Sequence, residues 1–155
     1  MTGAGPTHHR IEVATPILAS NRERVGLDLV PPSGDRARDA AELFELAAVV
    51  LCHDGADDPV FIYANAAAAA LWRMDVSELI GMPSRLTAPP ERRDERSAML
   101  DEATTTGVLQ GYSGERVASD GTRFVISDAT LWKVDGLPMG PGLAAMFTRW
   151  RPQAS

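Results

Sequence analysis

The sequence contains one cysteine, one lysine and no apolar run long enough to cross a membrane. Cys52 can form no disulfide within the chain, and its apolar surroundings predict a buried, unreactive thiol in a reducing compartment. The first residues lack the basic and apolar regions of a signal peptide, so we expect a cytoplasmic protein. The net charge of −6 and the lack of a basic stripe argue against nucleic-acid binding.

What the chain does contain is typical of one globular domain. Its 155 residues are 45% hydrophobic and 23% charged, which predicts an ordinary buried core. Thr15-Pro16 predicts the start of a short helix that ends at Gly26, and Asp35 predicts the cap of a second helix. We therefore expect a disordered leader over residues 1–14 and a helical extension over residues 15–47.

The middle of the chain changes from strand patterns to helix patterns. An apolar run from Ala48 predicts a strand, the polar segment 53–59 a turn, and residues 60–64 the returning strand. Asn65 then precedes five alanines, Leu71 and Trp72, which predicts a capped helix with few bulky side chains. Such a helix can lie close to a sheet and leave space beside it. A further helix is expected over residues 91–106, ended by Gly107.

The last third has strand patterns. Residues 112–119, 123–134 and 143–150 predict three strands, and Asp120-Gly121 predicts a tight hairpin between the first two. The order of elements predicts an α+β domain over residues 48–151, followed by a tail over residues 152–155. One antiparallel sheet would carry helices inserted between its second and third strands.

Several motifs match a known family. YAN-x-A at the second strand and D-x-x-E-L-I-G after the alanine helix resemble the PAS fold. The segments MPSRLT, RRDER, GYSGERVASDGTRFVISDATLW and LAAMFTRW resemble the MEKHLA family of PAS-related domains, over residues 17–150. The resemblance implies a PAS-like five-stranded antiparallel sheet with helices on one face and a hollow between them. It implies the sensing of a small molecule, redox state or light, but no general ligand or catalytic residue.

Asp128 is the main candidate for a functional residue. Strand alternation places it on one face with Phe124, Ile126, Thr130 and Trp132. A carboxylate there must be paired, solvated or protonated, and Arg85 and Arg116 are the expected partners. The pair would either fix a loop to the sheet or orient a ligand at the rim of the hollow. The aromatic residues expected to line that hollow, or to fill the core, are Tyr63, Trp72, Tyr112 and Trp132.

The leading functional hypothesis is a ligand-binding or sensory module that lacks its own output domain. It would bind an unidentified small organic molecule and signal through a homodimer or a partner, by way of the N-terminal helices. The sequence identifies no cofactor. Two are disfavoured: Cys52 lies outside the helical region where a light-oxygen-voltage flavin site needs it, and His53, in a predicted loop, is a poor haem ligand. The alternatives are a small cofactor-independent enzyme that uses Asp128, Arg116 and Tyr112, and an interaction domain with a filled core. No catalytic residue, metal site, nucleic acid or membrane is predicted.

Overall fold

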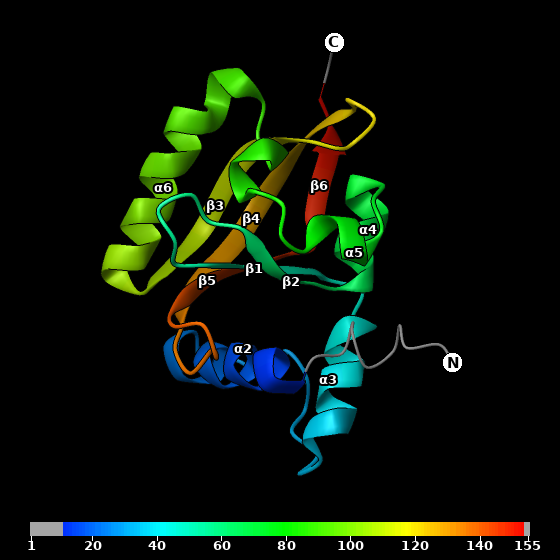
Figure 1. The fold of residues 1–155 in the computed structure, drawn as a ribbon, viewed down its shortest axis with the longest axis vertical. Coiled ribbons are helices and arrows are strands. Elements are labelled where there is room, and N and C mark those ends of the chain that lie inside the picture. Colours follow the sequence, from blue (N-terminus) through cyan, green and yellow to red (C-terminus); the bar gives the residue numbers. More distant parts are fainter. Residues whose placement is uncertain (1–10, 154–155) are drawn as a thin grey trace.

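An antiparallel sheet with helices on both faces forms the part of the chain that the computed structural model describes, residues 11–153 (Figure 1). The strand order is β2-β1-β5-β4-β3, and β6 also pairs with β4. The strands are β1 (Val49–Asp54), β2 (Phe61–Ala64), β3 (Val108–Val117), β4 (Arg123–Val134), β5 (Gly142–Phe147) and β6 (Arg149–Pro152). The predicted α+β fold with a five-stranded antiparallel sheet is therefore confirmed. The predicted last strand is divided in two at Thr148, which adds β6 to the sheet.

A bulge in β4 changes which side chains face the hollow. Asp128 has a φ of 56°, and the pairing of β4 with β3 slips by one residue between Ile126 and Ala129. Ile126 and Ala129 consequently belong to one core cluster, while Trp132 lies in the cluster on the opposite face. The predicted shared face of Phe124, Ile126, Asp128, Thr130 and Trp132 is wrong, because a strand with an extra residue does not alternate through it.

One face of the sheet carries the helices that enclose the hollow. They are α4 (Ala66–Trp72), α5 (Val76–Leu79), the 3₁₀ turns η1 (Ser84–Thr87) and η2 (Pro90–Arg92), and α6 (Arg93–Thr106). Asn65 caps α4 as predicted, because its side-chain oxygen accepts a 3.1 Å hydrogen bond from the Ala68 amide. Alanine favours the helix, and the methyl groups of α4 let it approach β1 closely.

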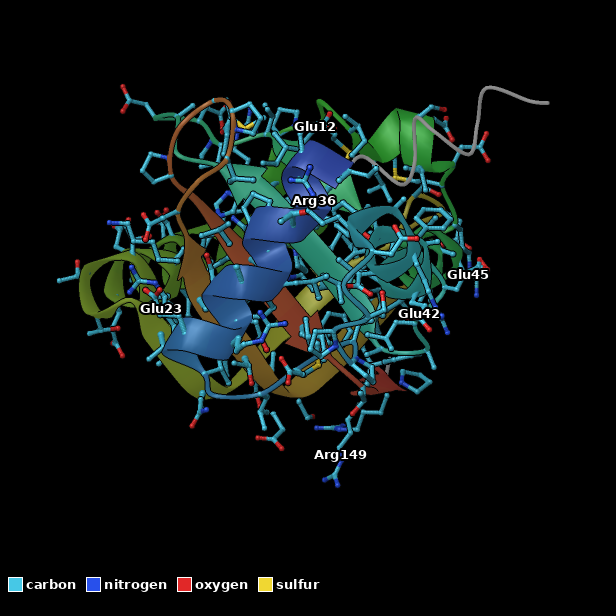
Figure 2. The ribbon with its side chains drawn as sticks, turned by 90° about the horizontal axis from the view of Figure 1, so that it is seen from below. Glu12, Glu23, Arg36, Glu42, Glu45 and Arg149 are labelled. Atoms are coloured by element: carbon cyan, nitrogen blue, oxygen red, sulfur yellow. The ribbon has the colours of Figure 1, made fainter. Side chains whose placement is uncertain are left out.

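The opposite face is covered by α2 (Ile11–Arg24) and α3 (Arg36–Phe44), and Figure 2 shows α2 lying across the sheet. The helix α2 begins at Ile11, before the predicted start, and contains Pro16. Val13 and Ile17 are fully buried there, so packing outweighs the hydrogen bond that the proline removes. The predicted leader otherwise falls on residues 1–10, outside the described residues. Asp35 caps α3 as predicted.

Two hydrophobic clusters result, one on each face of the sheet. The first lies between the sheet and α4–α6, and the second lies beneath α2 and α3. No helix among residues 11–153 is long and apolar enough to span a bilayer.

Candidate functional site

A small cavity lies between the sheet and the helices α4 and α6. Its volume is about 40 Å³, which gives room for a few water molecules. Side chains fill most of the remaining hollow, and Trp72 makes edge-to-face contacts with Phe124 and Phe147 at 5.2 and 6.2 Å between ring centroids. The wall is mainly apolar, but it includes the polar side chains of His53, Thr87, Arg96, Tyr112 and Arg116.

Tyr112 and Arg116 form one side of the cavity from the edge strand β3. Both side chains are buried, and Arg116 Nη2 donates a 2.8 Å hydrogen bond to the Tyr112 phenol oxygen. Arg116 Nη1 donates a second bond, of 2.7 Å, to the backbone oxygen of Glu115. Gly114 lies between them on the same strand face, and a β-carbon there would lie 2.6 Å from the Tyr112 oxygen. A glycine at this position leaves the space that the pair occupies.

Arg96 reaches the same cavity from α6. Only 9% of this residue is exposed, and its Nε has no hydrogen-bond partner among the described residues. Burial lowers the pKa of Arg96 to about 10, and the nearby positive charge of Arg116 acts in the same direction. The side chain therefore remains charged at neutral pH. Arg96 is not among the residues predicted from the sequence, although Arg96, Met99 and Ala103 have the spacing of one helix face.

His53 lies at the β1 side of the cavity. It was predicted to lie in a loop, but it is the fifth residue of β1 and is buried. Its Nδ1 is 3.3 Å from the hydroxyl oxygen of Ser84, and its Nε2 has no partner among the described residues. Burial lowers the pKa of His53 to about 4, with a further contribution from the charge of Arg96. The imidazole is therefore neutral at pH 7.

Three of the seven predicted site residues come together in the cavity wall: Trp72, Tyr112 and Arg116. Tyr63 and Trp132 lie on the opposite face of the sheet, in the cluster beneath α2. The Trp132 indole donates a 3.3 Å hydrogen bond to the backbone oxygen of Ile17, and burial raises the pKa of the Tyr63 phenol. Of the two expectations for the aromatic residues, Tyr63 and Trp132 thus follow the second and fill the core, while Trp72 and Tyr112 line the cavity. Both faces of the sheet are buried, so alternation alone does not assign a side chain to either one.

The two remaining predicted residues, Arg85 and Asp128, lie outside the cavity wall. Arg85 is exposed and pairs with Asp58 at 3.1 Å. Asp128 is exposed at the bulge of β4, so the predicted pairing of Asp128 with Arg85 or Arg116 is absent from the described ion pairs. No aspartate or glutamate belongs to the cavity wall that the described residues form. The enzyme hypothesis thereby loses the acid that it assigned to Asp128.

A shallow groove of about 250 Å³ lies on the outer side of the same residues. The groove and the cavity share Arg96, Tyr112 and Arg116, so these three side chains separate the interior from the surface. Glu95 and Glu115 also line the groove, and Glu115 forms ion pairs with arginines outside the cavity. A ligand that enters from this side would pass between α6 and β3.

The sheet, the helices on its one face and the enclosed hollow define a PAS-like domain. The chain belongs to the MEKHLA family, whose domain model matches residues 11–152. This match includes α2 and α3, so the N-terminal helices are part of the family's domain and not an addition to it. No curated protein matches the sequence.

Solved structures confirm the fold. A PAS domain from Colwellia psychrerythraea superimposes with a TM-score of 0.60 at 15% identity, over 70% of this chain and 92% of that one. A PAS domain from a two-component sensor histidine kinase superimposes with a TM-score of 0.56 at 13% identity, over 72% of this chain and 89% of that one. A Rhodobacter sphaeroides LOV protein superimposes with a TM-score of 0.52 at 17% identity, over 64% of this chain and 58% of that one. At these identities the likeness concerns the fold alone.

The cysteine of the chain is buried in the sheet, away from the hollow. Cys52 lies in β1, its side chain packs in the cluster beneath α2, and its sulfur is 3.7 Å from the backbone oxygen of His53. Burial raises the pKa of the Cys52 thiol, which keeps it protonated and unreactive. The side chain thus lies on the face of the sheet opposite the helices α4–α6.

Proposed function

We propose that this domain is a sensory module that binds a small molecule in the cavity between β1, β3 and α6. Three buried polar atoms without hydrogen-bond partners among the described residues carry the proposal: His53 Nε2, Trp72 Nε1 and Arg96 Nε. All three side chains belong to the wall of one cavity. Buried polar groups in folded proteins are nearly always paired, because an unpaired group costs about 1–3 kcal/mol. A ligand with several acceptor atoms would satisfy them together.

The sheet offers a path from this site to a surface. His53 faces the cavity, while its neighbour Cys52 packs beneath α2, because adjacent residues of β1 point to opposite faces. A shift of β1 on ligand binding would therefore change the support under the N-terminal helices. Their outer side carries exposed acidic residues, among them Glu23 and Glu42 (Figure 2). We place the contact with a second copy or a partner protein on this layer.

Native mass spectrometry of the full chain, purified without dialysis, tests the proposal. The expected result is a protein mass increased by a stoichiometric small molecule, which is lost on denaturation. The same spectrum reports the number of subunits. Melting temperatures measured with a panel of small acids, bases, amides and alcohols check the result on protein freed of its ligand. A ligand that binds only the folded state raises the melting temperature, and the stabilisation grows with the logarithm of its concentration relative to Kd.

A second candidate is an interaction domain with a filled core, and the cavity volume of about 40 Å³ favours it. This hypothesis predicts no retained mass and no rise in melting temperature with any compound of the panel. That outcome would overturn the sensory proposal, and the unpaired atoms of His53, Trp72 and Arg96 would then be paired by water.

A further inference from the structure

The described residues place two buried positive charges in the cavity wall and no negative charge to balance them. Arg96 and Arg116 are 9% and 7% exposed, and both line the cavity. The ion pairs of the described residues include neither of them. Arg116 is bonded only to neutral oxygen atoms, and Arg96 Nε has no partner.

This arrangement is costly without a counter-charge. A buried ion loses its hydration, and paired or hydrogen-bonded partners normally replace that hydration. Here each guanidinium also raises the cost of the other, since the charge of Arg116 lowers the pKa of Arg96. The adjacent carboxylate of Glu115 offers no relief, because it pairs with Arg92 at 3.1 Å and Arg123 at 3.6 Å. A negatively charged molecule that enters the cavity would supply this compensation.

We propose that the ligand is a short-chain monocarboxylate whose carboxylate group is bound by Arg96 and Arg116. This inference rests on the proposed ligand-binding function and names the chemical class of its ligand. Guanidinium groups form paired hydrogen bonds with the two oxygens of a planar carboxylate. Leu100, Ile126 and Leu131 in the same wall provide apolar contacts for a body of a few carbon atoms. The small volume of the cavity excludes a bulky acid unless the wall moves.

The surroundings favour a carboxylate over a phosphate. Arg92, Glu95 and Glu115 line the outer groove through which a ligand would reach the arginines, and Arg92 pairs with both carboxylates. The groove therefore adds to Arg96 and Arg116 no further unpaired cation that would favour a dianion over a monoanion. The third basic side chain of the cavity wall, His53, is neutral, because burial and the charge of Arg96 lower its pKa to about 4. The site thus offers two positive charges among apolar side chains, without the further cations that a phosphate dianion requires.

The first experiment needs no variant. Acetate, propionate and butyrate are titrated calorimetrically into the ligand-free full chain at constant ionic strength, beside acetamide, propionamide and butyramide, and beside inorganic phosphate. We expect at least one acid to bind about tenfold or more tightly than its amide, since a charge-assisted pair is lost in the amide. Equal binding of acid and amide would overturn the inference but leave the ligand-binding function intact, and so would preferential binding of phosphate.

A pair of matched variants tests the residues. Arg96→Met keeps the aliphatic stem but removes the charge, and Arg85→Met makes the same change at an exposed position outside the cavity. We expect Arg96→Met to weaken binding of the acid about tenfold or more. Arg85→Met should bind the acid as tightly as the unmodified chain does. Without ligand, Arg96→Met should melt no lower than the unmodified chain, because it removes an uncompensated charge. A lower melting temperature with binding retained would assign Arg96 a structural role and overturn the inference.

If none of the acids, amides or phosphate binds, native mass spectrometry decides which statement fails. A retained neutral molecule would overturn the carboxylate inference alone. The absence of any retained mass would overturn the ligand-binding function as well.

Discussion

The phenol oxygen of Tyr112 accepts a 2.8 Å hydrogen bond from Arg116, and both side chains extend across Gly114 on the same face of β3. The guanidinium carbon of Arg116 also lies 5.4 Å from the centroid of the Tyr112 ring. The tyrosine therefore orients the arginine toward the cavity without neutralising it. A residue with a side chain at position 114 would displace the pair.

Gly114→Ala is predicted to disturb the site more than the fold. The new β-carbon would lie 2.6 Å from the Tyr112 oxygen and 3.0 Å from Arg116 Nη1, the far ends of two flexible side chains. Because φ at Gly114 is not positive, the backbone accepts an alanine. We expect a loss of about 1 kcal/mol in the free energy of unfolding, measured in urea, and a weakened affinity for propionate.

Gln110→Ala provides the control for this experiment, because Gln110 is an exposed residue of the same strand outside the cavity wall. Its stability and propionate affinity should match those of the unmodified chain. Unchanged propionate binding in Gly114→Ala would show that the orientation of Arg116 is irrelevant to the ligand.

Asn65 is predicted to contribute more to stability than an ordinary helix cap. Its buried side chain accepts hydrogen bonds from the amides of Val50 and Ala68 and donates to the backbone oxygens of Leu43 and Ala48. Asn65→Ala leaves these four backbone groups without that partner in the core. We expect a loss of about 3 kcal/mol in the free energy of unfolding, measured by urea denaturation.

Asp35→Ala, which removes the exposed cap of α3, is the comparison variant for Asn65→Ala. The side chain of Asp35 accepts hydrogen bonds from the amides of Ala37 and Arg38, at the surface. Asp35→Ala should cost about 1 kcal/mol, the usual value for a cap. Equal losses in the two variants would mean that the contacts of Asn65 beyond α4 contribute nothing.

Local chemistry in the sequence predicts much of this fold. Asp35, Asn65 and Gly107 occupy the helix ends that their side chains or positive φ favour, and these three predictions are confirmed. The site is harder to predict, because it depends on which face of an element points inward. Arg96 was missed because an arginine on a helix is normally expected to face solvent. Asp128 was misplaced because a bulge at a residue other than glycine has no clear local signal.

His53 predicts a specific loss of stability in acid. Its pKa is lowered to about 4 in the folded protein by burial first and by Arg96 second, while Asp54 opposes the shift. The unfolded chain binds the proton near pH 6.5, so the unfolded state takes up a proton that the native state excludes. Stability from the neutral imidazole is thus complete above pH 6.5 and is lost as the pH falls toward 4. The loss amounts to about 3 kcal/mol.

Urea denaturation of the unmodified chain and of His53→Gln at about pH 7 and about pH 4.5 measures this contribution. Carboxylates titrate over the same pH range in both proteins. The difference between their free energies of unfolding therefore reports the contribution of His53 alone. We expect the stability advantage of the unmodified chain to shrink as the pH falls. A difference that stays constant with pH would show that folding does not lower the pKa of His53.

We expect Asp128 to support the backbone of the bulge rather than to bind a ligand. With a φ of 56° it occupies the left-handed region, which asparagine adopts readily and valine does not. Asp128→Asn should change the free energy of unfolding by less than about 0.5 kcal/mol and leave propionate affinity unchanged. Asp128→Val should cost about 1–2 kcal/mol, because a β-branched side chain clashes with the backbone in this conformation. Thr130→Val, at an ordinary position of β4, is the control and should be nearly neutral. A loss of propionate affinity in Asp128→Asn, with stability retained, would show that Asp128 contributes to ligand binding.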